Sequence, residues 1–193
     1  MTKKDAAFSC LYFSETGKSN TEKTLEAVNR RAQEPDIDTI ILPSTSGRTG
    51  LLAAEIIRDN KLVAVSHSTG FVRPDFQQMP EEARRKLENK GIKVLTCQHA
   101  FGGVGRAVRK KLDTYQTEEI IAHTLRLFGE GTKVAVEIAL MAADAGLVST
   151  QKPCISMGGT AQGVDTAVVL KPAHAQDFFD VKILEFIAKP LLT

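Results

Sequence analysis

The chain has 193 residues, of which 42% are hydrophobic and 25% charged, and its formal net charge is +2. These values are ordinary for one folded α/β domain, and they exclude a disordered chain and a strongly basic nucleic-acid-binding protein. The most apolar segment, 134–148, is interrupted by Glu137 and Asp144, which argues against a span of the membrane.

The cysteines point to a reducing compartment. Cys10, Cys97 and Cys154 are far apart and show no Cys/His spacing typical of a metal site, so we expect buried free thiols and no bound metal. The apolar stretch within residues 1–13 is too short for a signal peptide. We therefore expect a cytoplasmic protein.

Apolar runs of strand length alternate with helical patterns along the chain. We expect strands over residues 8–13, 39–42, 62–66, 92–96, 153–157 and 166–170. Helices are expected after a capping box at 19–22, then over 51–58, 80–91, 117–129 and 136–145. The tail at 181–188 alternates like an edge strand. This order predicts a single three-layer α/β/α domain over residues 1–193 with a mostly parallel sheet.

A hydroxyl-rich loop follows the second expected strand. Residues 43–50 read Pro-Ser-Thr-Ser-Gly-Arg-Thr-Gly and precede a helix. In an open α/β sheet, ligands bind beyond the carboxyl ends of the strands, and the free amides of a helix N-terminus attract anions. A helix cap with a surface arginine is the alternative, but a cap needs only one of these hydroxyls. We predict a phosphate site formed by Ser44, Thr45, Ser46, Gly47, Arg48 and Thr49.

Two loops with histidines are expected at the same edge of the sheet. His67 and His99 are candidate general acids or bases, because histidine exchanges protons near neutral pH. The alternative for each is a hydrogen-bonding or ligand-contacting side chain, and the glycines at 102–105 are typical of a flexible loop. The first of these loops contributes candidate ligand-binding residues: His67, Ser68, Thr69 and Gly70.

A glycine-rich loop lies between the last two of these strands. It can form an anion nest or a lid over a ligand, and a plain connection between strands is the alternative. Its candidate ligand-binding residues are Gly158, Gly159, Thr160 and Gly163.

Other patterns indicate no known nucleotide motif or catalytic pair. Gly17-Lys18-Ser19 lacks the earlier glycine of a Walker loop, since Tyr12 stands at that position. Glu137 and Asp144 are seven residues apart on one expected helix, and we interpret each as a buried, hydrogen-bonded acid. The basic stretch 106–111 is interpreted as a solvated face.

Residues 39–49, with the helix and the strand that follow them, resemble the C-terminal α/β domain of pyruvate kinase. The resemblance continues through the apolar helix 136–145 and the glycine-rich loop to the strand 166–170. In that family a Ser-Gly-Arg-Ser/Thr loop holds a phosphate of a sugar bisphosphate activator. The resemblance implies that residues 45–49 hold a phosphate here. It also implies a homo-oligomer, because the family's domain forms subunit contacts.

The sequence departs from that family in ways that affect the function. Pyruvate kinase carries out phosphoryl transfer in a separate barrel domain, for which 193 residues leave no room, so kinase activity is not expected. The late loop lacks the tryptophan and arginine that grip the activator. Segments 67–80 and 98–117 resemble additions, which suits a larger ligand such as a mononucleotide or flavin mononucleotide (FMN).

We therefore expect a protein that binds a phosphorylated small molecule, with FMN as one candidate cofactor and neither nucleic acid nor membrane as a partner. The chain also resembles small stand-alone bacterial and archaeal relatives of the domain. An enzyme that uses the same pocket and an oligomerising interaction protein are the alternatives.

Overall fold

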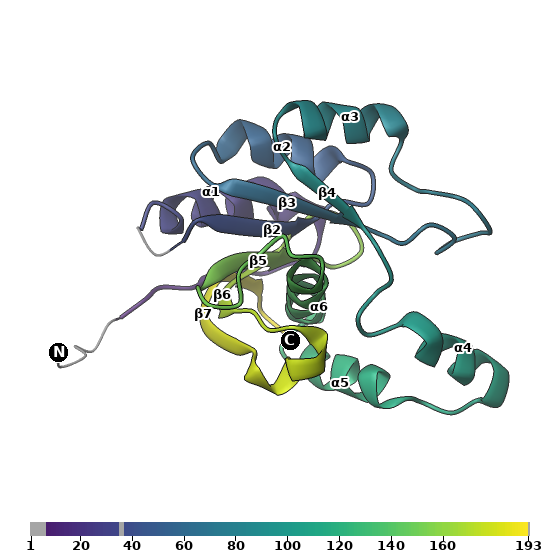
Figure 1. The fold of residues 1–193 in the computed structure, drawn as a ribbon. Helices are drawn as coiled ribbons and strands as arrows, with labels where there is room; N and C mark the ends of the chain where they lie inside the picture. Colours follow the sequence, from purple (N-terminus) through teal and green to yellow (C-terminus); the bar gives the residue numbers. More distant parts are fainter. Residues whose placement is uncertain (1–6, 35–36, 193) are drawn as a thin grey trace.

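One seven-stranded sheet organises the molecule (Figure 1). The computed structural model describes residues 7–34 and 37–192, so the first six residues of the expected N-terminal segment lie outside it. In chain order the elements are β1 (Leu11–Phe13), η1 (Lys18–Asn20), α1 (Thr21–Arg31), β2 (Thr39–Pro43), α2 (Arg48–Ile56), β3 (Lys61–Ser66), α3 (Glu81–Asn89), β4 (Lys93–Thr96), α4 (Gly103–Leu112), α5 (Thr117–Arg126), α6 (Glu130–Asp144), β5 (Cys154–Gly158), β6 (Thr166–Lys171), η2 (Ala175–Asp180) and β7 (Lys182–Pro190).

The sheet is mostly parallel, as predicted. Its strand order is β1-β7-β6-β5-β2-β3-β4. Strand β6 pairs antiparallel with both of its neighbours, while the other pairings are parallel. The expectation that the tail is an edge strand is wrong, because β7 lies between β6 and β1. Ile187 and Ala188 in the second half of β7 are buried, whereas Ile183 and Leu184 in its first half are exposed.

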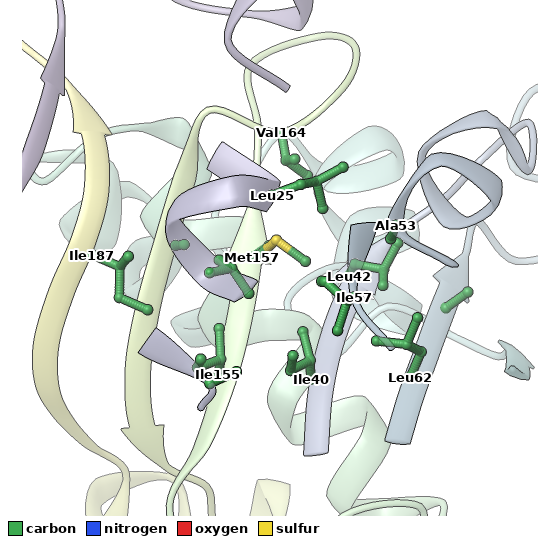
Figure 2. Close-up of a cluster of buried hydrophobic side chains, with 14 of the residues drawn as sticks. Leu25, Ile40, Leu42, Ala53, Ile57, Leu62, Ile155, Met157, Val164 and Ile187 are labelled. Atoms are coloured by element: carbon green, nitrogen blue, oxygen red, sulfur yellow. The ribbon is translucent and has the colours of Figure 1, made fainter. Parts of the chain in front are cut away.

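Helices cover both faces of the sheet. Helices α1, α2 and α3 lie on one face, and α6 lies on the other with α5 outside it (Figure 1). The core under the first three helices includes Leu25 of α1, Leu42 of β2 and Met157 of β5 (Figure 2). On the opposite face, Ala135, Ile138 and other α6 residues pack on β2, β3, β5 and β6. Burial on both faces explains why the central strands are continuous apolar runs.

Two helices depart most from the prediction. Helix α6 was expected over 136–145 but begins at Glu130, after Gly129 with φ +109°. Its first residues are mostly polar, so the apolar pattern does not show where the helix starts. Helix α4 was not expected, since glycines weaken helices. Its Gly105 lies close to Glu118 at the start of α5, so a side chain there would displace the Glu118 carboxylate.

The start of α1 also differs from the expected capping box. The cap residue is Asn20, and its side chain makes no capping bond. Thr21 instead accepts a hydrogen bond from the amide of Val164, 143 residues later in the chain. The first turn of α1 is therefore fixed by a tertiary contact.

Candidate functional site

The candidate residues lie at one edge of the sheet because of the strand directions. Strands β1, β2, β3, β4, β5 and β7 all end at this edge, and β6 begins there. The loops after β2, β3 and β4 and the loop between β5 and β6 therefore share this edge, which is where open α/β sheets bind ligands. We refer to it as the carboxyl edge.

A buried hydrogen bond and close packing against α3 fix the shape of the loop after β2. Ser44 is buried, and its Oγ accepts a hydrogen bond from the Gly50 amide at 3.1 Å. Gly47 has φ +87°, and a Cβ there would lie only 2.7 Å from the Ala83 Cβ of α3. Glycine is therefore required at 47 both by the backbone conformation and by the close approach of α3.

The upper side of the same loop presents hydrogen-bond donors. The backbone amides of residues 46–49 have no acceptor within residues 7–34 and 37–192. The Arg48 guanidinium lies across the loop, where its Nε donates to Ser46 Oγ at 3.2 Å. Free amides at the start of α2, a partial positive charge and a guanidinium form an arrangement that can accept an anion.

The glycine-rich loop between β5 and β6 meets this first loop. The Arg48 Nη2 lies 3.4 Å from Gln162 Oε1, which links the two loops at an exposed position. Gly163 has φ +71°, and a side chain there would collide with Thr21 and the backbone of Lys18. The structure thus brings together two of the loops that the sequence analysis singled out.

Asp165 holds the glycine-rich loop from inside. Its fully buried carboxylate accepts hydrogen bonds from the Gly17 amide at 2.8 Å, the Thr160 amide at 3.2 Å and the Thr166 hydroxyl at 2.9 Å. The loop after β1 is therefore tied to the loop after β5.

Lys18 is a residue that sequence reasoning missed. It follows Gly17 directly and lies beside Gly163, with its own side chain exposed. The Gly-Lys-Ser signal was visible, but it fits no phosphate motif. Only the tertiary contact through Asp165 shows that Lys18 stands next to the glycine-rich loop.

The loop after β3 consists of His67, which contacts Gln78, and a turn over residues 68–76 that is closed by its own hydrogen bonds. His67 is half-buried, and its Nδ1 lies 2.7 Å from Gln78 Oε1. The turn that follows is closed on itself, since the Phe71 amide donates to Ser68 O and the Gly70 amide donates to Phe76 O. Within the described part of the chain, Ser68, Thr69 and Gly70 form no hydrogen bond with residues 44–49.

His67 and His99 come together at the carboxyl edge. Their ring centroids are 5.2 Å apart. The centroid of the Phe71 ring lies 4.4 Å from that of His67 and 4.8 Å from that of His99, on which Phe71 stacks. The Arg106 guanidinium lies 5.0 Å from the centroid of the Phe71 ring. This stack joins segments 67–80 and 98–117.

A buried ion pair lies under His99. Lys133 and Glu137, one turn apart on α6, are paired, and Glu137 Oε1 also accepts the Phe101 amide at 3.0 Å. Glu137 Oε1 is 4.0 Å from His99 Nδ1. Burial lowers the pKa of His99 to about 4, although the nearby Glu137 carboxylate opposes this shift. His99 is therefore neutral at pH 7.

The expectation for the two acids on α6 is correct for Glu137 and wrong for Asp144. Glu137 is buried and hydrogen-bonded, whereas Asp144 is exposed at the end of the helix and bonds His174 and the Ala175 amide. Seven residues place both on one face of the helix, but the face runs out of the core before Asp144.

The cysteines vary in burial. Cys154 is buried, and burial raises its pKa to about 12, which makes its thiol a poor nucleophile. Cys10 and Cys97 are only half-buried, which differs from the expected full burial. All three are free thiols.

Two cavities lie away from the carboxyl-edge loops. One, of about 500 Å³, is lined by residues such as Cys10, Arg30 and Glu185, and the other, of about 280 Å³, by residues such as Ile92 and Leu147. Among the described residues, no group of three His, Cys, Asp or Glu side chains is placed to hold a metal ion. None of the helices in that part of the chain has the length and apolar character needed to cross a membrane.

A family model described as pyruvate kinase, alpha/beta domain, matches residues 22–170. The chain belongs to the pyruvate kinase alpha/beta domain family. The match covers more than three quarters of the chain, and both the hydroxyl-rich loop and the glycine-rich loop fall inside it. The resemblance inferred from the sequence is confirmed.

This pyruvate kinase alpha/beta domain also has parts outside the match. Strand β1, Lys18 and β7 all lie beyond residues 22–170. Two of the seven strands are thus added at one side of the matched sheet. The same added part brings Gly17 and Lys18 to the glycine-rich loop.

Proposed function

We propose that this protein binds a phosphorylated small molecule at residues 44–49. The observation that carries the proposal is the set of unpaired amides at 46–49 beside the Arg48 guanidinium, at the start of α2. A phosphate oxygen can accept from several such donors at once, and charge-assisted bonds of this kind are the stronger ones. The hydroxyls of Thr45, Ser46 and Thr49 supply further donors.

Ser44 has a different part in this proposal. Its hydroxyl already bonds the Gly50 amide beneath the loop, so it shapes the site while the residues after it contact the ligand. The glycine-rich loop forms the opposite wall of the site, where the backbone of Gly158, Gly159, Thr160 and Gly163 faces the ligand. Lys18 supplies a second positive charge besides Arg48. A sugar phosphate, a mononucleotide or FMN each carries the required phosphate.

A thermal-shift experiment tests the proposal. The probes are inorganic phosphate, fructose 1,6-bisphosphate, AMP and FMN, each added to wild type, Arg48→Glu and Arg58→Glu. Arg58 is an exposed cation just beyond the other end of α2, so its variant has the same charge change away from the site. A ligand at a hundredfold its Kd stabilises a protein by about 2.7 kcal/mol.

We expect at least one probe to raise the melting temperature of wild type and of Arg58→Glu, with the shift lost in Arg48→Glu. If no probe stabilises the folded wild-type protein, the phosphate site is rejected. The visible absorption spectrum of the freshly purified protein separately tests for bound flavin.

The proposal includes no pyruvate kinase activity. The transfer of phosphate from phosphoenolpyruvate to ADP needs carboxylates that hold metal and a lysine at the transferred phosphate, and the proposed site contains a phosphate cradle without such a set. A standard coupled assay is expected to show no pyruvate formation. Turnover that Arg48→Glu abolishes would contradict this part of the proposal.

A further inference from the structure

One side chain at the tip of the glycine-rich loop contacts the proposed phosphate loop. Gln162 Oε1 lies 3.4 Å from Arg48 Nη2, and Arg48 Nε donates to Ser46 Oγ at 3.2 Å. A guanidinium can only donate hydrogen bonds, so it is held between two acceptors, one from each loop. Arg48 Nη1 makes no hydrogen bond within residues 7–34 and 37–192 and is available to an anion.

The backbone at the tip of this loop is strained. The Gln162 amide donates to Thr160 O at 2.8 Å, around Ala161 with φ +62°. A hydrogen bond between residues two apart around a positive φ forms the rare and strained kind of three-residue turn. The other non-glycine residues with positive φ in the described ranges are Asp75 and Asp113, and aspartate tolerates this conformation better than alanine does. Strain of this kind clusters at ligand clamps.

The neck of the loop keeps the strain at Ala161. A side chain at Gly159 would collide with the Gly163 carbonyl, so the two ends of the tip lie against each other. The Asp165 amide donates to Gly158 O at 3.0 Å and closes the neck. The tip therefore cannot relax by sliding, and the turn holds the side chain that contacts the guanidinium in a fixed place.

The Gln162 carboxamide also has an unused donor. Because Oε1 faces the guanidinium, Nε2 is the other arm of the carboxamide, and it makes no hydrogen bond with any residue that the structure describes. Gln162 is exposed, so this donor is accessible to a ligand. It adds to the unpaired amides at 46–49 on the other loop.

We propose that Gln162 is a specificity-determining residue that selects a terminal phosphate monoester; this proposal rests on the phosphate site proposed above. Its Oε1 positions the Arg48 guanidinium, and its Nε2 donates to a phosphate oxygen. The phosphate is then held by donors from two loops, the amides at 46–49 on one loop and the carboxamide on the other.

The number of donors sets the class of ligand. A phosphate monoester presents three terminal acceptor oxygens and a charge of about −2. A phosphodiester lacks one of these oxygens and about half of the charge, because a second organic group takes the place of the third oxygen. Donors from both loops together with the guanidinium therefore fit sugar phosphates and mononucleotides, and they disfavour cyclic nucleotides and the internal phosphates of dinucleotides.

Two small probes test this selection without depending on the organic part of the ligand. Methyl phosphate is a monoester, and dimethyl phosphate is a diester. Each is titrated into the ¹⁵N-labelled full chain, and its Kd is obtained from the shifts of the amides at 46–49. We expect methyl phosphate to bind wild type at least about tenfold more tightly than dimethyl phosphate, because charge-assisted hydrogen bonds are the stronger ones.

The variant Gln162→Ala should reduce this discrimination. Its affinity for methyl phosphate is expected to fall roughly tenfold, as for a lost hydrogen bond to a charged group, and its affinity for dimethyl phosphate by about twofold or less. The control is Gln151→Ala, at an exposed position before β5 and thus at the other end of that strand, which should bind both probes like wild type. Equal losses for both probes in Gln162→Ala, or no loss for either, overturn the inference.

The variant Arg48→Glu separates this inference from the phosphate site itself. Loss of methyl phosphate binding in Arg48→Glu, with wild-type discrimination in Gln162→Ala, keeps the phosphate site and overturns the role of Gln162. No binding of methyl phosphate to wild type rejects both proposals.

The strained turn is tested with Ala161→Gly, which leaves the Gln162 side chain in place. Glycine adopts a positive φ without strain but also allows other conformations, so the tip is no longer fixed. We expect an unfolding free energy close to that of wild type and an affinity for methyl phosphate that is about threefold lower or more, through lost preorganisation. Adding Ala161→Gly to Gln162→Ala should cause no further loss, because the turn acts through Gln162. Wild-type affinity in Ala161→Gly would overturn the positioning by the turn.

Discussion

Asp165 is the residue on which the loops around the site depend most. Its buried carboxylate accepts from the Gly17 and Thr160 amides and from the Thr166 hydroxyl. Two of these donors belong to different loops, so a single side chain aligns the segment after β1 with the glycine-rich loop. The sequence analysis did not select it, because an Asp between two strands is also typical of an ordinary turn.

We expect Asp165→Asn to destabilise the fold by about 2–3 kcal/mol, because a neutral amide replaces the buried carboxylate that accepts from Gly17, Thr160 and Thr166, and hydrogen bonds to a charged group are the stronger ones. The free energy of unfolding is measured with urea. Asp177→Asn, at an exposed position, is the control and should lie within about 0.5 kcal/mol of wild type. Equal stability of the two variants would mean that the Asp165 hydrogen bonds contribute little.

His99 predicts a dependence of stability on pH. Its pKa in the folded state is lowered to about 4, mainly by burial, with His67, Lys133 and Arg106 acting in the same direction and Glu137 against it. The unfolded chain has the ordinary value near 6.5 and binds the proton more readily, so stability rises with pH. The contribution of His99 is complete above about pH 6.5 and is lost as the pH falls toward 4.

Replacing His99 should reduce this dependence. Between pH 7 and pH 4.5, we expect His99→Phe to lose roughly 2 kcal/mol less stability than wild type does, with a reduced effect if solvent reaches the ring. Urea unfolding at both pH values measures the difference, and His174→Gln serves as the exposed control. An unchanged pH dependence in His99→Phe would show that other groups determine it.

At the scale of elements, the contact between α2 and α3 depends on Gly47. Gly47 and Gly70 both have positive φ, +87° and +81°, but a side chain at 47 meets Ala83 whereas the space around 70 is open. Gly70→Ala should cost about 1 kcal/mol through backbone strain alone. Gly47→Ala should cost about 1–3 kcal/mol more, through the added collision, and should weaken phosphate binding. Equal unfolding free energies for the two variants would rule out the collision.

The interior position of β7 gives a second prediction at this scale. Ile187 is buried between the sheet and α1, while Leu184 on the same strand is 58% exposed. We expect Ile187→Ala to lower the unfolding free energy by about 2–4 kcal/mol and Leu184→Ala by less than about 1 kcal/mol. Similar, small losses at both positions would show that Ile187 contributes little to the core.

The elements differ in how well the sequence predicts them. The strands β2, β3, β5 and β6 were predicted within one or two residues, because burial on both faces makes each a continuous apolar run. Helix α4 was not predicted, because the glycines at 102, 103 and 105 are typical of a loop. The close approach of Glu118 to Gly105 is a tertiary contact that the local pattern cannot show. The place of β7 in the sheet is likewise set by its pairing with β1, which local pattern cannot show.

The site was predictable only where one stretch of chain contains it. The hydroxyl-rich loop and the helix after it are local, so their role as an anion-binding candidate could be inferred from residues 43–50 alone. The pairing of His67 with His99 and the approach of Lys18 to Gly163 depend on the strand order. Residues from three or more loops meet at the carboxyl edge, and no single segment encodes that meeting.

At the scale of the whole molecule, exposed apolar side chains gather outside the α5–η2 cluster. Helix α5 and η2 pack on α6 through Ala122, Leu140 and Phe178. Phe179 is 84% exposed and Leu127 is 74% exposed on the outside of this cluster. Leu192 lies next to Gly129 in the same region and is also exposed. Exposed apolar side chains that lie together are a candidate surface for contact with a partner.

The homo-oligomer expected from the family resemblance therefore stays a prediction, with this surface as its candidate interface. Sedimentation velocity over a range of protein concentrations should show a species heavier than the 21.0 kDa chain. Because charge in a buried apolar interface is costly, Leu127→Lys combined with Phe179→Lys should weaken self-association at least tenfold. Lys substitution at Val104 and Leu112 of α4, equally exposed but on another helix, is the matched control. A wild-type protein that is monomeric at all concentrations would reject the oligomer, and an equal effect of both pairs would place the interface elsewhere.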